Sequence, residues 1–155
     1  MSKKPSVDGM TPLAKEGYEI RQKIFGADNV NAWHERVADD PFLMQYFDFT
    51  HEICFAKLWG RNTLDMRMRS ILSLAINAAN GAPSAIRRHV RSCVTQGLSK
   101  EEIGEVLLHV YVYAGAHSSF GAFTVAREVF EEMESEGIVI PEKAQWPSSS
   151  TDGAA

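Results

Sequence analysis

Residues 65–79, DMRMRSILSLAINAA, form a segment whose second half is apolar almost all round a helical wheel. A helix of this kind is normally surrounded by other helices or by another subunit, because each of its faces is apolar. We therefore expect it at the centre of the fold. Asn80 and Gly81 end this helix, Pro83 opens the next one, and Gly97 closes that second helix as a left-handed C-terminal cap.

The rest of the chain follows the same helical period. Apolar residues recur at spacings of three and four, whereas the alternating runs typical of strands are scarce, so we predict an all-α fold. Asp39 or Asp40 can cap one further helix, and Ser99 with Glu102 forms a capping box for another. Further helices are expected over residues 11–25, 41–58, 100–113 and 118–135.

Length and composition indicate one small domain. The chain has 155 residues, 45% of them hydrophobic, and can bury one core, which we place in a helical domain over residues 10–138. Residues 1–9 and the tail, residues 139–155, are expected to be flexible, although the tail contains Trp146. The formal net charge of −4 provides no basic field, so we expect no nucleic-acid partner. The absence of a long apolar run and of a leader pattern predicts no membrane partner and a cytoplasmic location.

The cysteines and histidines show no metal-binding spacing. Cys54 and Cys93 belong to no CxxC pair, and the five histidines show no HExxH pattern. We therefore expect no metal and no redox dithiol. His34 and His51 are expected on the surface or in packing.

The stretch AIRRHVRSC at residues 85–93 places one histidine among three arginines and no carboxylate. On a helical wheel Ile86, Val90, Cys93 and Val94 form a buried stripe, and His89 lies just outside it beside small neighbours. Partial burial next to cations disfavours the imidazolium, so His89 should be a ready base near neutral pH.

Both the histidine and the arginines of this stretch also have common structural roles. A histidine at such a boundary is more often a packing residue bonded to a backbone carbonyl than a catalytic group. Arg87, Arg88 and Arg91 are more often a solvated face or intersubunit ion pairs than a substrate clamp, although a guanidinium can bind a carboxylate bidentately. The residues alone leave both alternatives open.

A wider pattern runs through LWGRNTLDMRMRSILSLAINAANG at 58–81, HVRSCVTQGLSKEEIGEVLLHVYVYAG at 89–115 and AFTVAREVFEE at 122–132. These segments resemble the carboxymuconolactone decarboxylase family, small all-helical proteins of the AhpD-like superfamily that include the lactone decarboxylases of protocatechuate breakdown. The pattern W-x-R-x-x-L-D-x-(K/R)-x-R-S is met from Trp59 to Ser70, and H-V-R-x-x-x-x-x-G from His89 to Gly97. The resemblance implies an AhpD-like helical bundle in a homo-oligomer, a trimer or hexamer, with sites partly built where subunits meet. The peroxide-reducing branch with CxxC is not matched.

Two positions depart from the family pattern. Family members place a carboxylate four residues before the histidine of H-V-R, where this chain has Ala85, and the proline of Y-A-G-x-P is His117 here. The sequence therefore predicts that one proton-transfer group has been exchanged for another.

The resemblance implies a decarboxylase that needs no cofactor and acts on a small carboxylated lactone, an anionic substrate. Arg61 or Arg91 would bind a carboxylate or polarise the lactone oxygen. His89 would pass a proton to the carbon that loses carbon dioxide, and His117 would replace the missing carboxylate. Trp59 would cover the pocket, and Ala85, at the position of the family carboxylate, would also contact the substrate.

Two other functions remain open at this point. The same groups suffice for an isomerase or hydrolase of a related unsaturated acid or lactone, which the loss of the family acid favours. A non-catalytic, oligomeric ligand-binding protein is the second alternative. Among the residues with weaker indications, Tyr111 and Tyr113 are expected in the core, Cys93 is expected to be an ordinary buried thiol, and the role of His109 stays undecided.

Overall fold

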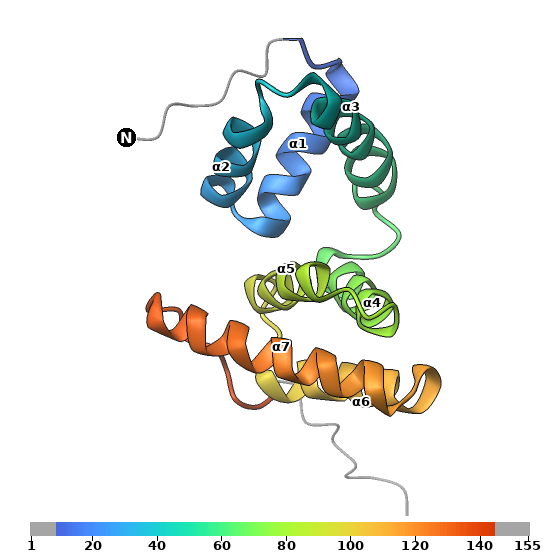
Figure 1. Ribbon diagram of the computed structural model, residues 1–155, viewed down its shortest axis with the longest axis vertical. Coiled ribbons are helices and arrows are strands. Elements are labelled where there is room, and N and C mark those ends of the chain that lie inside the picture. The colour runs from blue at the N-terminus through green and yellow to red at the C-terminus, as the bar shows by residue number, and fades with distance from the viewer. Residues whose placement is uncertain (1–8, 145–155) are drawn as a thin grey trace, which may run out of the picture. The chain divides into compact units, whose positions relative to one another are not determined.

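The computed structural model of the protein describes residues 9–144 (Figure 1). Within that range all elements are helices and there is no strand, which confirms the predicted all-α class. The elements in chain order are α1 (Pro12–Phe25), α2 (Ala27–Val37), α3 (Pro41–Phe49), the π-helix η1 (Thr50–Trp59), α4 (Met66–Ala79), α5 (Pro83–Thr95), α6 (Lys100–Ala114) and α7 (Ala116–Ser135).

The chain divides into two compact units, Met1–Ser70 and Ile71–Ala155, and the division falls within α4. The expected single domain over residues 10–138 stays a prediction. Among the described residues, no helix has both the length and the apolar character that a membrane span requires.

The N-terminal unit is built on the packing of α1 against η1. Ile20 and Ile24 of α1 form a buried cluster with Phe55 and Trp59 of η1. The predicted start of α1 is confirmed, because Thr11 caps it and accepts a hydrogen bond from the backbone N–H of its third residue at 3.1 Å. These contacts set the position of Trp59, a predicted site residue, in the core of this unit.

Gly17 allows α1 to approach η1 closely. A Cβ atom at this position would lie 1.8 Å from the carbonyl oxygen of His51 and 2.5 Å from its carbonyl carbon. Both obstacles are backbone atoms, which cannot rotate away as the end of a side chain can. Glycine is therefore required where these two helices meet.

The helix expected over residues 41–58 is present but changes its winding. Asp40 caps it as predicted, because its carboxylate accepts from the backbone N–H groups of Phe42 and Leu43. From Thr50 the chain continues as a π-helix. A π-helix has wider turns and is usually found only as single-turn bulges. Neither capping residues nor apolar spacing predicts it.

The helix α2 is not predicted from the sequence. It follows Gly26, whose φ of 85° breaks the chain direction after α1, and no side chain caps its first turn. Its buried residues are Val30, His34 and Val37, which follow helical spacing but include one polar side chain. The local signal for this helix is therefore weak, and its packing in the N-terminal unit stabilises it.

The C-terminal unit packs α5 and α6 against α7. Figure 1 shows α6 and α7 side by side. The predicted buried stripe of α5 is confirmed, since Ile86, Val90, Cys93 and Val94 are all buried. The predicted capping box of α6 is also confirmed, with Ser99 and the first-turn glutamate bonded reciprocally.

The helix α4 is buried on one face only. Leu74 and Ala78 have no exposed surface, whereas Leu72 and Ile76 are 47% and 60% exposed. The expectation that other helices surround it is therefore not met by the described chain. Between residues 71 and 144, nothing covers the outer side chains of Leu72 and Ile76 fully.

The first residues of the tail are attached to α6. Ile140 is buried, and the backbone N–H groups of Lys100 and Glu101 donate to the carbonyl oxygens of Pro141 and Glu142 at 2.8 and 3.1 Å. These N–H groups lie in the first turn of α6, where a helix has no internal acceptors for them. Residues 140–142 of the tail therefore contact the C-terminal unit, and the flexibility expected for residues 139–155 stays a prediction. Trp146 and the expected flexible residues 1–8 lie outside the described residues.

Candidate active site

Within α5, His89 is partly buried. Burial first, and then the positive charge of Arg88, lower the pKa of His89 from 6.5 to about 4. The direction of this shift is the one that the sequence predicts. At neutral pH the imidazole is therefore neutral and can accept a proton.

Small side chains flank the imidazole along α5. Ala85 lies one turn before His89 and is itself only partly buried, and the fully buried Cys93 lies one turn after it. A glutamate at position 85 would place a carboxylate on the same side of the helix as His89, because residues four apart are neighbours on a helix. Its absence leaves the imidazole without the negative charge that would raise its pKa.

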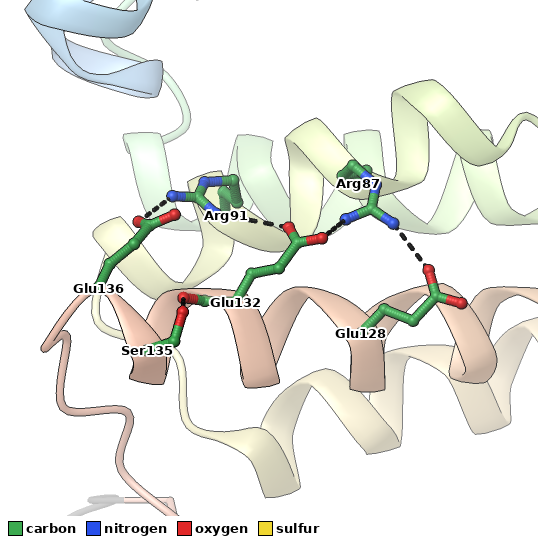
Figure 2. A network of polar contacts seen from close by, with 6 residues as sticks. All are labelled: Arg87, Arg91, Glu128, Glu132, Ser135 and Glu136. Atoms are coloured by element: carbon green, nitrogen blue, oxygen red, sulfur yellow. Dashed lines mark hydrogen bonds and ion pairs between the residues drawn. The ribbon is translucent and has the colours of Figure 1, made fainter.

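Two arginines of α5 form ion pairs with carboxylates on α7 and just after it (Figure 2). Arg87 contacts Glu128 at 2.7 Å and Glu132 at 2.6 Å, whereas Arg91 lies 3.9 Å from Glu132 and also pairs closely with Glu136. Glu132 therefore lies between the two guanidinium groups. The sequence left a solvated face or intersubunit ion pairs as alternatives to a substrate clamp. Arg87 and Arg91 are ion-paired, but their partners lie in the same chain. Arg91 as a substrate anchor stays a prediction, and it would have to exchange these partners.

Substitution of Glu132 by glutamine tests how much these ion pairs contribute to the free energy of unfolding. Its contacts are partly exposed, and such ion pairs contribute about 0–1 kcal/mol each because solvent and salt screen them. We expect Glu132→Gln to lower the free energy of unfolding by about 1 kcal/mol or less, measured by urea denaturation at low and high salt. The loss should shrink at high salt. A large loss that is independent of salt would contradict this account.

The other predicted anchor, Arg61, lies in the N-terminal unit beside a cavity of about 530 Å³. Trp59, Asn62 and Lys23 also line it, together with the carboxylates of Glu16, Glu19 and Asp65. Arg61 is exposed, and within residues 9–144 its guanidinium has no hydrogen-bond or ion-pair partner. Of the two arginines considered for this role, Arg61 is the one whose charge is available to a ligand.

Trp59 forms a wall of this cavity. Its side chain is only 6% exposed and packs in the core cluster of the N-terminal unit. Its predicted role, to cover the substrate pocket, stays a prediction.

His117 lies in the first turn of α7 and is exposed. His109 is exposed on α6, where its Nδ1 lies 3.2 Å from the carbonyl oxygen of Glu105, and its ring stacks on Tyr113 at 6.3 Å between centroids. The expectation that the tyrosines pack in the core is wrong, because Tyr111 is 55% and Tyr113 is 84% exposed.

A second group of ionisable side chains is buried in the N-terminal unit. His51 is fully buried, and the Arg21 guanidinium donates from Nη1 towards its Nε2 at 3.1 Å. Tyr18 makes edge contacts with the rings of both His34 and His51. Of the two roles predicted for these histidines, surface or packing, the structure shows packing. Burial first, then Arg21 and His34, lower the pKa of His51 to about 4.

The lowered pKa of His51 predicts that the folded protein loses stability as the pH falls. Because its folded-state pKa of about 4 lies below the usual 6.5, the stability that it contributes is complete above pH 6.5 and is lost as the pH falls towards 4. The shift corresponds to about 3 kcal/mol. We expect the midpoint of urea denaturation to fall steadily from pH 7 to pH 4.5, also in a His89→Asn variant, which removes the other strongly shifted histidine. A midpoint that stays constant over this range would contradict the expectation.

No group of three or more histidine, cysteine, aspartate or glutamate side chains that could hold a metal ion occurs between residues 9 and 144. The candidate groups are the imidazoles of His89 and His117 in the C-terminal unit and, described separately, the Arg61 guanidinium beside a cavity in the N-terminal unit.

Comparisons with known proteins identify the family of this chain. Residues 45–128 match the model of the carboxymuconolactone decarboxylase family. The chain is 33% identical over 129 residues to a 4-carboxymuconolactone decarboxylase of Acinetobacter baylyi, covering 83% of this chain and 92% of that protein. It is 29% identical over 126 residues to a nitrosuccinic acid decarboxylase of Metarhizium robertsii, covering 81% of this chain and 86% of that protein. The chain, with its all-α fold and its motifs around Trp59 and His89, belongs to the carboxymuconolactone decarboxylase family.

Proposed function

We propose that the protein is a decarboxylase that acts without a cofactor on a small carboxylated lactone similar to γ-carboxymuconolactone. Two similar proteins are named as decarboxylases of small acids, which supports this reaction class. The observation that carries the proposal is the neutral, partly buried imidazole of His89 in the H-V-R motif.

In this reaction the bond between the carboxylate carbon and the ring carbon breaks, and carbon dioxide leaves. The electron pair of that bond passes into the conjugated carbonyl, and the ring carbon then receives a proton. Because His89 is neutral at neutral pH, it must accept a proton before it can deliver one to carbon. We assign His117 to the role of the missing family carboxylate, which is to exchange a proton with His89.

The anionic substrate requires a cationic anchor. We assign this role to Arg61, because its guanidinium is exposed, lines a cavity and has no partner within residues 9–144, whereas Arg91 is paired with two carboxylates. A guanidinium binds a carboxylate through two parallel hydrogen bonds and stabilises negative charge on the lactone oxygen. Trp59 would cover the substrate pocket, and Ala85 would leave space next to His89.

The reaction is tested by mixing the protein with γ-carboxymuconolactone, or separately with nitrosuccinate, and measuring carbon dioxide release. Release above the buffer rate supports the proposal. If no carbon dioxide appears but NMR shows that the lactone is consumed, the isomerase or hydrolase alternative replaces it. If neither compound reacts but one binds, the protein is a ligand-binding member of the family.

We also propose that the protein forms a homo-oligomer, a trimer or hexamer. Exposed apolar side chains support this assembly, since large exposed apolar patches mark interaction surfaces. They lie on α4, α6 and α7 and include Leu72, Ile76, Leu108, Tyr111, Val112, Tyr113, Phe120 and Phe123. Sedimentation velocity measures the assembly, and a monomer at micromolar concentration would contradict it. Both described cysteines are free thiols, which fits the proposed cytoplasmic location.

A further inference from the structure

Arg69 is a buried arginine whose hydrogen bonds go to the loop that carries Arg61. Its side chain is 8% exposed. The guanidinium donates from Nε to the carbonyl oxygen of Leu64 and from Nη2 to the carbonyl oxygen of Arg61, both at 3.1 Å. Within the described residues no carboxylate lies within ion-pair distance of it. A full positive charge is therefore buried and held mainly by two backbone carbonyls.

This arrangement restrains the backbone of Arg61 from both sides. Its N–H donates to the carbonyl oxygen of Leu58 at 3.2 Å, and its own carbonyl oxygen accepts from Arg69. The far end of the loop is held by Asp65, whose carboxylate accepts from the backbone N–H of Met68 at 2.7 Å. The side chain of Arg61 thus extends from a fixed point, although the side chain itself has no partner in the described chain.

The hydrogen bonds to Arg69 also set the direction of two carbonyl dipoles. Arg61 and Leu64 line the cavity of about 530 Å³, whereas Arg69 does not. Their carbonyl oxygens point to the buried guanidinium, so the negative ends of these dipoles are neutralised there. The cavity also has Glu16, Glu19 and Asp65 in its lining, so an anionic ligand there depends on Arg61 and Lys23 for attraction.

We propose that Arg69 is a positioning residue for Arg61: it holds the loop at residues 61–64 so that the Arg61 guanidinium can bind the carboxylate of the substrate in the cavity beside it. The inference rests on the proposed anchoring role of Arg61. Arginine suits the task because its planar fork reaches two acceptors at once, whereas lysine is a single point of charge. Displacement of Arg61 by about 1 Å would be enough to weaken a bidentate contact severely.

The first test is a double-mutant cycle on steady-state decarboxylation. We expect Arg69→Gln to raise KM about tenfold or more, with a smaller change in kcat, and Arg69→Lys to give an intermediate value. If Arg69 acts through Arg61, the double variant Arg61→Gln/Arg69→Gln should be no worse than Arg61→Gln alone. Additive losses in KM would overturn the inference.

Ser70→Ala is the matched control for stability. The Ser70 hydroxyl is buried next to Arg69 in the sequence of α4 and donates to the carbonyl oxygen of Met66 at 2.9 Å. The Ser70→Ala substitution should lower Tm while leaving KM unchanged. If Ser70→Ala raises KM as much as Arg69→Gln does, the effect of Arg69 is one of general stability and the inference is wrong.

A binding readout separates this inference from the proposed reaction. Succinate, a dicarboxylate probe, is titrated into the full-length protein while the Arg61 Nε–H signal is followed by ¹⁵N NMR, with Arg61→Lys used to assign the signal. We expect succinate to shift the Arg61 signal in the wild type. The affinity for succinate should be about tenfold weaker in Arg69→Gln and intermediate in Arg69→Lys. If this holds while no carbon dioxide is released, the inference stands and the decarboxylase proposal fails. Equal succinate affinity in wild type and Arg69→Gln, or no response of Arg61 in the wild type, would overturn it.

Discussion

Replacing His89 by asparagine should lower kcat by about 10²–10⁴-fold, the usual contribution of a general acid or base. Asparagine keeps a polar side chain of similar size but cannot carry the proton. Carbon dioxide release from γ-carboxymuconolactone measures the rate, and circular dichroism with Tm checks that the fold is kept. His89 must be protonated to deliver a proton to carbon, and its pKa is about 4, so the reactive imidazolium becomes more populated as the pH falls. The wild-type rate should therefore rise from pH 7 towards pH 5.

His109→Asn is the matched control for this change. His109 is an exposed histidine of the same unit, bonded only to its own helix and stacked on a tyrosine among the described contacts, so its loss should leave kcat within about twofold. An undiminished rate in His89→Asn would remove His89 from the mechanism. The kcat of His117→Asn should lie between those of the other two variants, because water can partly replace a group that relays a proton.

The second large effect is expected for Gly17→Ala in the N-terminal unit. The added Cβ would lie 1.8 Å from the carbonyl oxygen of His51, so α1 could not keep its packing on η1. We expect a loss of about 3 kcal/mol or more in the free energy of unfolding, at the upper end of overpacking effects. Urea denaturation followed by circular dichroism measures this loss.

Gly121→Ala is its control. Gly121 lies inside α7, and a Cβ there would meet no atom within 4 Å. The same substitution should therefore stabilise the protein by up to about 1 kcal/mol, because alanine is the better helix former. If Gly17→Ala were as stable as Gly121→Ala, the close approach of α1 and η1 would be wrong.

Local chemistry made several helices predictable. The residues Thr11, Asp40 and Ser99 each cap a helix at the expected place, because a capping side chain bonds backbone groups only two or three positions away. The buried stripe of α5 followed from its 3.6-residue period. The helix α2 and the π-winding of η1 were not predictable in this way, since α2 has no side-chain cap and a π-turn depends on packing.

The candidate site was predictable only in part. The position of His89 at the edge of the stripe, and the direction of its pKa shift, followed from its neighbours on the same helix. Whether each arginine is ion-paired did not follow from the sequence. Nothing local distinguishes Arg91, which is paired, from Arg61, which is unpaired within the described chain, because the partners of Arg91 lie on another helix.

The sequence by itself determined the helical class, most helix starts, the family motifs and the chemical types of the site residues, because each depends on residues within a few turns of one another. Only the tertiary structure decided which charges are available. The contacts of Arg87 and Arg91 join residues that lie 41–45 positions apart, so they exist only once α5 has packed against α7. The same is true of His51, whose pKa falls because folding buries it beside Arg21.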